Sequence, residues 1–227
     1  ELSPQLEKII EDSGCKGKPH VGPNACMIKV LEQVSAGAFV GKVGGLQGNF
    51  DFGLLDLRKK QEFANPSRYS TRTQFIKCPF EYYNEELKQK FFDLIKRNDE
   101  KQCGETAQDK IGTLKGNWFF EKTTDSISQW NNYLAFVNDN QNPQMQVVSI
   151  GGLISSAGKL EFNPSSTGLI NRVFEQVTPD GKTYCFENQN FSGKIIVQML
   201  DETKIKIEHK TESCQPNESF SDPKTYQ

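Results

Sequence analysis

Short segments in which apolar and polar residues alternate fill the chain from residue 116 onward. Such alternation places successive side chains on opposite faces of a β-strand, so that one face can be buried. Turn-forming residues (Gly, Pro, Asn, Asp and Ser) separate the segments. Short strands joined by turns are typical of a β-barrel or β-sandwich built as a meander. The predicted strands are residues 116–122, 132–139, 145–154, 158–164, 169–177, 182–188, 193–200 and 204–211.

The first half of the chain combines predicted helices with predicted strands. An N-terminal helix is expected after Ser3, which can cap it, with Pro4 at its first position. The clearest helix is predicted over residues 84–97, where Asn84 is the N-cap and apolar residues recur at helical spacing. Strands are predicted at residues 27–34, 38–43 and 49–57.

Residues 98–113 are polar and almost free of large apolar side chains. A stretch of this kind is typical of a boundary between domains. We therefore predict a mainly β protein of two small domains. Residues 1–105 would form a β fold with one or two helices, and residues 106–227 a meander barrel of about eight strands.

Charge and hydropathy exclude two classes of partner. The 227 residues carry 27 Lys and Arg against 29 Asp and Glu, a net charge of −2. This balance gives no general electrostatic attraction to nucleic acid or to an anionic membrane. No apolar run approaches the roughly 20 residues that span a bilayer. The sequence therefore predicts neither a nucleic-acid partner nor a membrane span.

The six cysteines show no C-x-x-C spacing, which argues against zinc ribbons and thioredoxin-like redox sites. An even number of cysteines instead indicates disulfides, and hence a secreted or cell-surface protein in an oxidising compartment. The alternative, a set of buried free thiols, stays open. Proximity along the chain favours the pairs Cys15–Cys26, Cys78–Cys103 and Cys185–Cys214.

The segment VSAGAFVGKVGG, residues 34–45, spaces glycines in a turn-rich pattern, and the alternating segment NFDFGLLD follows it. Together they resemble the second half of the lysostaphin-type zinc endopeptidase domain, firmly over this segment and loosely over residues 1–80. With the apolar positions kept in register, Asn49 and Asp51 fall where the family has its two strand histidines. The matching positions are Val34, Gly37, Val40, Gly41, Gly44, Phe50, Phe52 and Leu54.

The departure from that family bears most on function. Zinc hydrolysis needs two or three strong ligands, an open position for water and a base. Asn is a poor zinc ligand, and the two histidines, His20 and His209, lie away from the motif strand. We therefore interpret Asn49 and Asp51 as vestigial metal positions, and predict no catalytic residue, no bound metal and no cofactor. The alternative is a zinc-dependent cell-wall or protein hydrolase completed by residues upstream of this chain.

The segment GTLKGNW, which ends at Trp118, opens the second predicted domain. It is similar to the opening motif of lipocalins, which are calycin β-barrels. The resemblance implies that Trp118 plugs the closed end of the barrel and that an Arg packs over its ring. Arg172 is the only Arg after residue 97 and so the only candidate for this pair.

The lipocalin resemblance also implies an apolar pocket at the open end of the barrel. Bulky inward-facing side chains could instead fill a small barrel, and we favour a filled interior. The candidate inward positions are Phe120, Phe136, Val148, Phe162, Phe174 and Phe186.

Taken together, these features predict a non-catalytic secreted or cell-surface protein with a binding or structural role. Its scaffold would be peptidase-like but without zinc ligands, and its partner an extracellular polymer, a protein or a small ligand. Besides the hydrolase, the remaining alternative is a carrier of a small apolar ligand through the second barrel.

Overall fold

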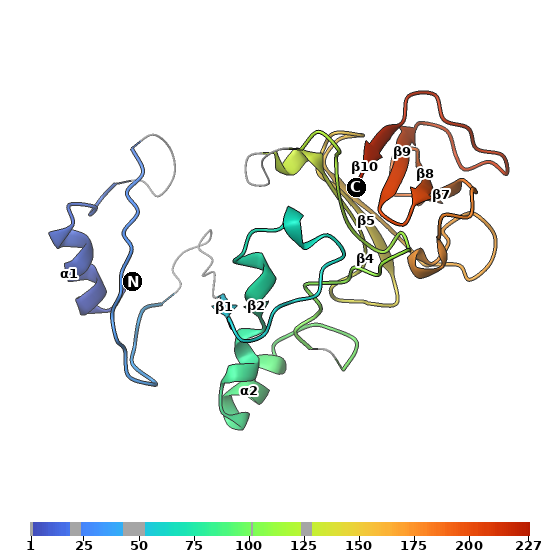
Figure 1. The fold of residues 1–227 in the computed structure, drawn as a ribbon. Coiled ribbons are helices and arrows are strands. Elements are labelled where there is room, and N and C mark those ends of the chain that lie inside the picture. Colours follow the sequence, from blue (N-terminus) through green and yellow to red (C-terminus); the bar gives the residue numbers. More distant parts are fainter. Residues whose placement is uncertain (1, 19–23, 43–52, 101, 124–128) are drawn as a thin grey trace. The chain divides into compact units, whose positions relative to one another are not determined.

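The computed structural model describes residues 2–18, 24–42, 53–100, 102–123 and 129–227 (Figure 1). Internal contacts divide the chain into two compact units, residues 1–52 and 53–227. The division differs from the predicted boundary after residue 105, because residues 63–69 pack on the first strand of the β region. The ring of Tyr69 meets that of Phe119 edge-on at 5.3 Å, and the Ala64 N–H donates to Asp109 at 2.9 Å.

The first unit contains the helix α1 (Pro4–Asp12), which Ser3 caps as predicted by accepting the Leu6 N–H. The strands predicted at residues 27–34 and 38–43 do not form in the described residues 24–42. A strand needs a neighbour with which to pair. For this segment, the described part of the unit provides only an isolated bridge between Leu2 and Gly41.

The second unit begins with short elements. Strand β1 (Leu54–Leu55) pairs antiparallel with β2 (Ile76–Lys77), and the short 3-10 helices η1 (Pro66–Arg68), η2 (Thr73–Phe75) and η3 (Pro79–Tyr82) lie around them. Helix α2 (Glu85–Phe92) follows, and its cap Asn84 accepts the Leu87 N–H at 3.0 Å.

Helix α2 is shorter than the predicted helix over residues 84–97. The Leu94 and Ile95 N–H groups donate to carbonyls three residues back instead of four, so the last turn tightens after Phe92. Beyond that turn, Arg97 forms an ion pair with Asp99 and also donates to the carbonyl of Asn140 at 2.7 Å. These contacts draw the chain out of the helix.

In the described part of the chain beyond α2, the strands form two four-stranded antiparallel sheets, which confirms the mainly β prediction (Figure 1). The first has the order β3-β4-β5-β6 and the second the order β10-β9-β8-β7. The 3-10 helix η4 (Trp130–Asn132) precedes β4. The strands are β3 (Gly116–Phe119), β4 (Tyr133–Asn138), β5 (Gln146–Ile150), β6 (Gly158–Phe162), β7 (Tyr184–Glu187), β8 (Lys194–Asp201), β9 (Lys204–Lys210) and β10 (Lys224–Tyr226).

Hydrogen bonds join the two sheets along one edge, where β3 meets β10. The Phe119 N–H donates to the carbonyl of Gln227 at 3.0 Å, and the Gln227 N–H donates back at 2.9 Å. Phe120 and Tyr226 form a further antiparallel bridge. The pattern had not predicted β10, a three-residue strand in a polar segment.

On the other side, between β6 and β7, residues 169–177 do not form the predicted strand. Asn171 has a φ of 51°, a left-handed conformation that interrupts an extended chain. Its side chain exchanges two hydrogen bonds with the backbone of Glu187, at 3.1 and 3.0 Å. The segment therefore lies along the edge of β7 through one bridge, between Ile170 and Cys185, and then turns into the short 3-10 helix η5 (Phe174–Gln176).

Aromatic rings fill the space between the sheets, as predicted. Five of the six predicted inward positions belong to the buried core, and Phe120 packs against it. The Phe174 ring lies 5.2 to 5.5 Å from those of Phe136, Phe162 and Phe186. Rings at these distances and tilts pack like the interior of a small-molecule crystal, and each buries a large apolar area.

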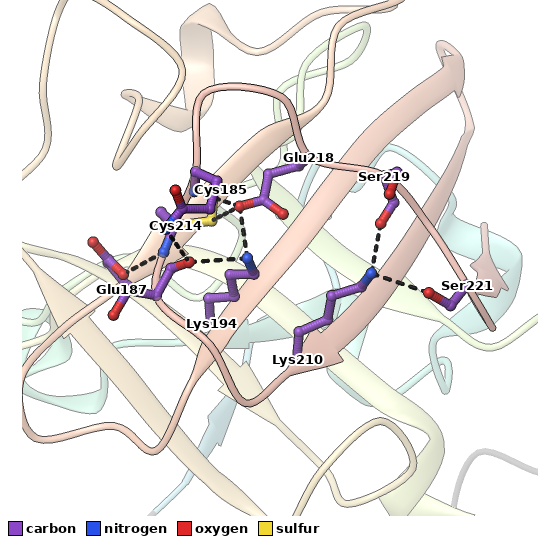
Figure 2. Close-up of polar contacts among 10 residues, drawn as sticks. Cys185, Glu187, Lys194, Lys210, Cys214, Glu218, Ser219 and Ser221 are labelled. Carbon is purple, nitrogen blue, oxygen red and sulfur yellow. Dashed lines mark hydrogen bonds and ion pairs between the residues drawn. A yellow bond between two sulfur atoms is a disulfide. The ribbon is translucent and has the colours of Figure 1, made fainter.

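All three predicted disulfides, Cys15–Cys26, Cys78–Cys103 and Cys185–Cys214, form in the structure. The third fastens residues 211–223, here called the strap, across the outer face of the second sheet (Figure 2).

Strand alternation directs Cys185, Lys194 and Ile196 away from the core, yet all three are buried. The strap covers Cys185 through its disulfide to Cys214, and Lys194 through two hydrogen bonds. Lys194 Nζ donates to Glu218 at 2.7 Å and to the Ser213 carbonyl at 3.0 Å (Figure 2). Both charged side chains are less than a tenth exposed, at 4% and 6%.

We expect Phe174→Ala to lower the free energy of unfolding of the second unit by about 3 to 5 kcal/mol, because it opens a cavity among three rings. Phe220→Ala is the matched control. The Phe220 ring is only partly buried and lies 4.4 Å from Lys206 Nζ, so its loss should cost about 1 kcal/mol or less. Denaturant unfolding measures both variants, and equal losses would contradict the close packing described above.

We expect Lys194→Met to cost about 3 kcal/mol or more, because it leaves the buried Glu218 carboxylate without its cation. Lys210→Met is the control on the same face, since Lys210 bonds the strap only through exposed contacts to Ser219 and Ser221. It should change the free energy of unfolding by about 0.5 kcal/mol or less. Chemical denaturation at neutral pH compares the two, and a mild loss in Lys194→Met would contradict the role given to the ion pair.

Candidate functional site

The motif GNW at the start of β3 is built around the carboxylate of Asp109. Gly116 has a φ of 142°, and a Cβ there would lie 3.0 Å from Asp109 Oδ1 and 3.1 Å from its Cα. Glycine is therefore needed at this position for a close approach of two chain segments. The backbone and side-chain N–H groups of Asn117 both donate to Asp109 Oδ1 at 3.2 Å.

Asp109 also holds the preceding segment against β3. Its Oδ2 accepts the Ala64 N–H at 2.9 Å and lies 3.5 Å from the Tyr69 hydroxyl. Burial raises the pKa of Tyr69, and the negative charge of Asp109 adds to that rise. Because both oxygens of Asp109 accept internal hydrogen bonds, its role is to join the two segments.

Trp118 stands at the end of the core next to this junction. Its side chain is buried, and its indole N–H donates to the Leu114 carbonyl at 2.8 Å. The Leu114 N–H in turn donates to the Val177 carbonyl at 3.0 Å, so the ring is held from two segments.

A cavity of about 350 Å³ opens beside this junction, and we call it the Trp118 cavity. Its volume falls within the usual range of small-molecule sites. Trp118 and Ile111 give it apolar walls, and Ile111 is largely exposed. Lys110 and Glu202 also line it, and neither forms an ion pair within the described residues. The cavity thus combines an apolar wall with one free charge of each sign.

A buried hydrogen-bond chain supports the wall that Lys115 contributes to the cavity. Lys115 Nζ lies 2.5 Å from Glu175 Oε1, and Gln146 Nε2 donates to Glu175 Oε2 at 3.1 Å. Gln146 Oε1 then accepts the Phe174 N–H at 3.0 Å. Burial raises the pKa of Glu175, but the hydrogen bonds from Lys115, the backbone and Gln146, together with the positive charge of Lys115, outweigh that rise, so the pKa lies below its usual value.

The structure gives the two residues of the predicted barrel-end pair different partners. Arg172 donates to the Ser166 carbonyl and bridges to Ser165, because the left-handed turn at Asn171 directs it there. Within the described part of the chain, the cation–π contacts are Lys59 over Tyr82 and Lys206 over Phe220. The expected contact of Arg172 over Trp118 is not among them.

The vestigial metal positions Asn49 and Asp51 lie outside the described residues, as does His20. Among the residues that are described, no group of three or more His, Cys, Asp or Glu side chains could hold a metal ion. The helices in that part of the chain are also too short or too polar to cross a membrane.

Sequence reasoning identified Trp118 but missed Asp109, Lys110 and Glu202. Asp109 lies within the polar stretch interpreted as a boundary, eight positions before Asn117, and belongs to no recognisable motif. Glu202 lies in the turn between β8 and β9. It lines the cavity beside Trp118 because the β3–β10 contact brings the two sheets together.

Comparison of the chain with known protein families, with curated proteins and with solved structures gives no significant match. Both family resemblances therefore rest on their motifs alone.

We expect Glu175→Gln to reduce the free energy of unfolding by about 1 kcal/mol at pH 7, because it removes the carboxylate that pairs with Lys115. A lowered pKa in the folded state contributes stability above the unfolded pKa, and this contribution is lost as the pH falls. The difference in the free energy of unfolding between the variant and wild type should therefore reach its maximum well above pH 4.5 and shrink as the pH falls below that value. Denaturation at pH 7 and pH 3 tests this.

The control for that experiment is Glu121→Gln, an exposed carboxylate that makes no side-chain hydrogen bond within the described residues. It should leave the free energy of unfolding unchanged at both pH values. A Glu175→Gln loss as large at pH 3 as at pH 7 would contradict the electrostatic role of Glu175.

Proposed function

We propose that the protein is a non-catalytic secreted or cell-surface binding protein whose ligand occupies the Trp118 cavity. The observation that carries this proposal is the contrast between a core filled by Phe rings and an open cavity of about 350 Å³ beside it. A filled interior argues against a carrier that encloses its ligand between the sheets. Binding at the mouth beside Trp118 remains compatible with the same fold.

The lining of the cavity favours a short peptide segment or an amino acid with an apolar side chain. The apolar wall of Trp118 and Ile111 would accept the side chain. Lys110 and Glu202 complement a carboxylate and an ammonium group, respectively. A ligand with one charge of each sign and an apolar body matches this combination.

The three disulfides support the extracellular part of the proposal, because such bonds persist in oxidising compartments. One of them lies in the first unit and two in the second, so they stabilise the folded state of both units.

The chain has two tryptophans, so a Trp130→Phe background leaves Trp118 as the only indole reporter. In this background we expect apolar dipeptides such as Leu-Leu to change the fluorescence of Trp118 in a saturable way. Ala64→Phe should weaken the binding at least about ten-fold, because a ring there occupies the cavity while the backbone N–H of residue 64 still reaches Asp109.

The matched control is Ala36→Phe, which places the same ring at an exposed position of the first unit. It should leave dipeptide binding unchanged, and near-ultraviolet circular dichroism should show all variants folded. If no dipeptide gives saturable binding, or if Ala64→Phe binds as well as its control, the proposed function is wrong.

A further inference from the structure

A second cavity, of about 450 Å³, opens at the base of the strap. It lies beside Gly193, just before β8, and Thr211, just after β9. Glu202 and Thr203 of the Trp118 cavity lie at the turn that joins the other ends of the same two strands. Strands β8 and β9, of eight and seven residues, therefore separate the two cavities by about 25 Å. We call the second one the strap cavity.

The walls of the strap cavity are fixed by bonds to the backbone. The Asn171 side chain is held by both backbone groups of Glu187. Glu187 Oε2 accepts the Cys214 N–H at 2.7 Å, next to the Cys185–Cys214 disulfide (Figure 2). A Cβ at Gly193 would lie 2.0 Å from the Lys210 carbonyl oxygen, so the chain can pass there only as glycine. The cavity is therefore preformed.

Several polar groups in this cavity have no partner within the described residues. The carboxamide of Gln189 and the hydroxyls of Thr211 and Ser213 are exposed and make no side-chain hydrogen bond there. Each of these groups can both donate and accept. Phe191 adds a half-buried ring, held edge-to-face against His209 at 5.6 Å.

The charges around the strap cavity disfavour an ionic ligand. Among the described residues that line the cavity, Glu187 alone is charged, and its carboxylate repels anions. A cation would meet a single carboxylate, and the Lys194 ammonium lies 3.0 Å from the Ser213 carbonyl. Calcium sites draw on six or more oxygens and generally on several carboxylates. What remains is a neutral ligand with many hydroxyls.

We propose that the strap cavity binds a neutral oligosaccharide. Sugar hydroxyls donate and accept, as the unpartnered amide and hydroxyl groups of the cavity require. The C–H face of a sugar ring is apolar and can lie on the Phe191 ring. This second site goes beyond the proposed peptide-binding function and does not depend on it.

The test is isothermal titration calorimetry of the full chain with maltotriose, cellotriose and the N-acetylglucosamine trimer. We expect at least one of these trisaccharides to bind. The double variant Gln189→Ala, Thr211→Ala should weaken its binding about ten-fold, because two hydrogen bonds to the ligand are lost. Neither side chain bonds the rest of the described protein, so the variant should stay folded.

The matched control is the double variant Gln176→Ala, Thr178→Ala, which removes the same two side chains from exposed positions outside the cavity. It should bind as wild type does. The proposal is overturned if no trisaccharide binds, if both double variants bind equally, or if calcium binds and is lost in the Gln189, Thr211 variant. Dipeptide binding at Trp118 should be unchanged in that variant, so failure of one proposal is distinguishable from failure of the other.

Discussion

The packing of Phe174 between the two sheets is the constraint on which the second unit depends. Its ring contacts Phe136, Phe162 and Phe186, although Phe174 itself lies on no strand. Its backbone N–H is held by Gln146, which is buried and bonded to Glu175. Because Glu175 also fixes Lys115 at the edge of the Trp118 cavity, core packing and cavity shape are set by one segment.

Each sheet also has an outer face that an irregular segment covers. Residues 63–69 cover β3, where Tyr69 contacts Phe119, and the strap covers β7 and β8. Irregular segments bury few apolar side chains, so they need other attachments. Asp109 provides one through its hydrogen bonds, and Cys185–Cys214 with Lys194–Glu218 provides the other. Both cavities occur where such a segment meets the edge of a sheet.

Features that depend on local sequence could be predicted. Alternation located seven of the eight described strands in the two sheets, since one buried face is enough to produce that pattern. Proximity along the chain was sufficient to predict the three disulfide pairs. The many Phe residues were sufficient to predict a filled interior.

Features set by distant contacts could not be predicted. Residues 169–177 alternate like a strand, but Asn171 adopts a left-handed conformation. Its side-chain hydrogen bonds to the Glu187 backbone accompany that conformation, and they join residues far apart along the chain. Strand β10 is too short to leave a pattern, and it forms because it pairs with β9 on one side and bonds to β3 on the other. Asp109 acquires its role by bonding to Asn117 and Ala64, and Glu202 by lining the same cavity as Trp118 from the turn after β8.

The pairing of β3 with β10 has a consequence for biosynthesis. Strand β3 is made early in the second unit, yet its hydrogen-bonding neighbour at residues 224–226 leaves the ribosome only after all the other strands. Until then the edge of β3 is open, and open edges recruit foreign strands. Contacts between segments so far apart along the chain also form slowly. A nascent chain of this protein should therefore rely on chaperones that shield that edge until translation has passed β10.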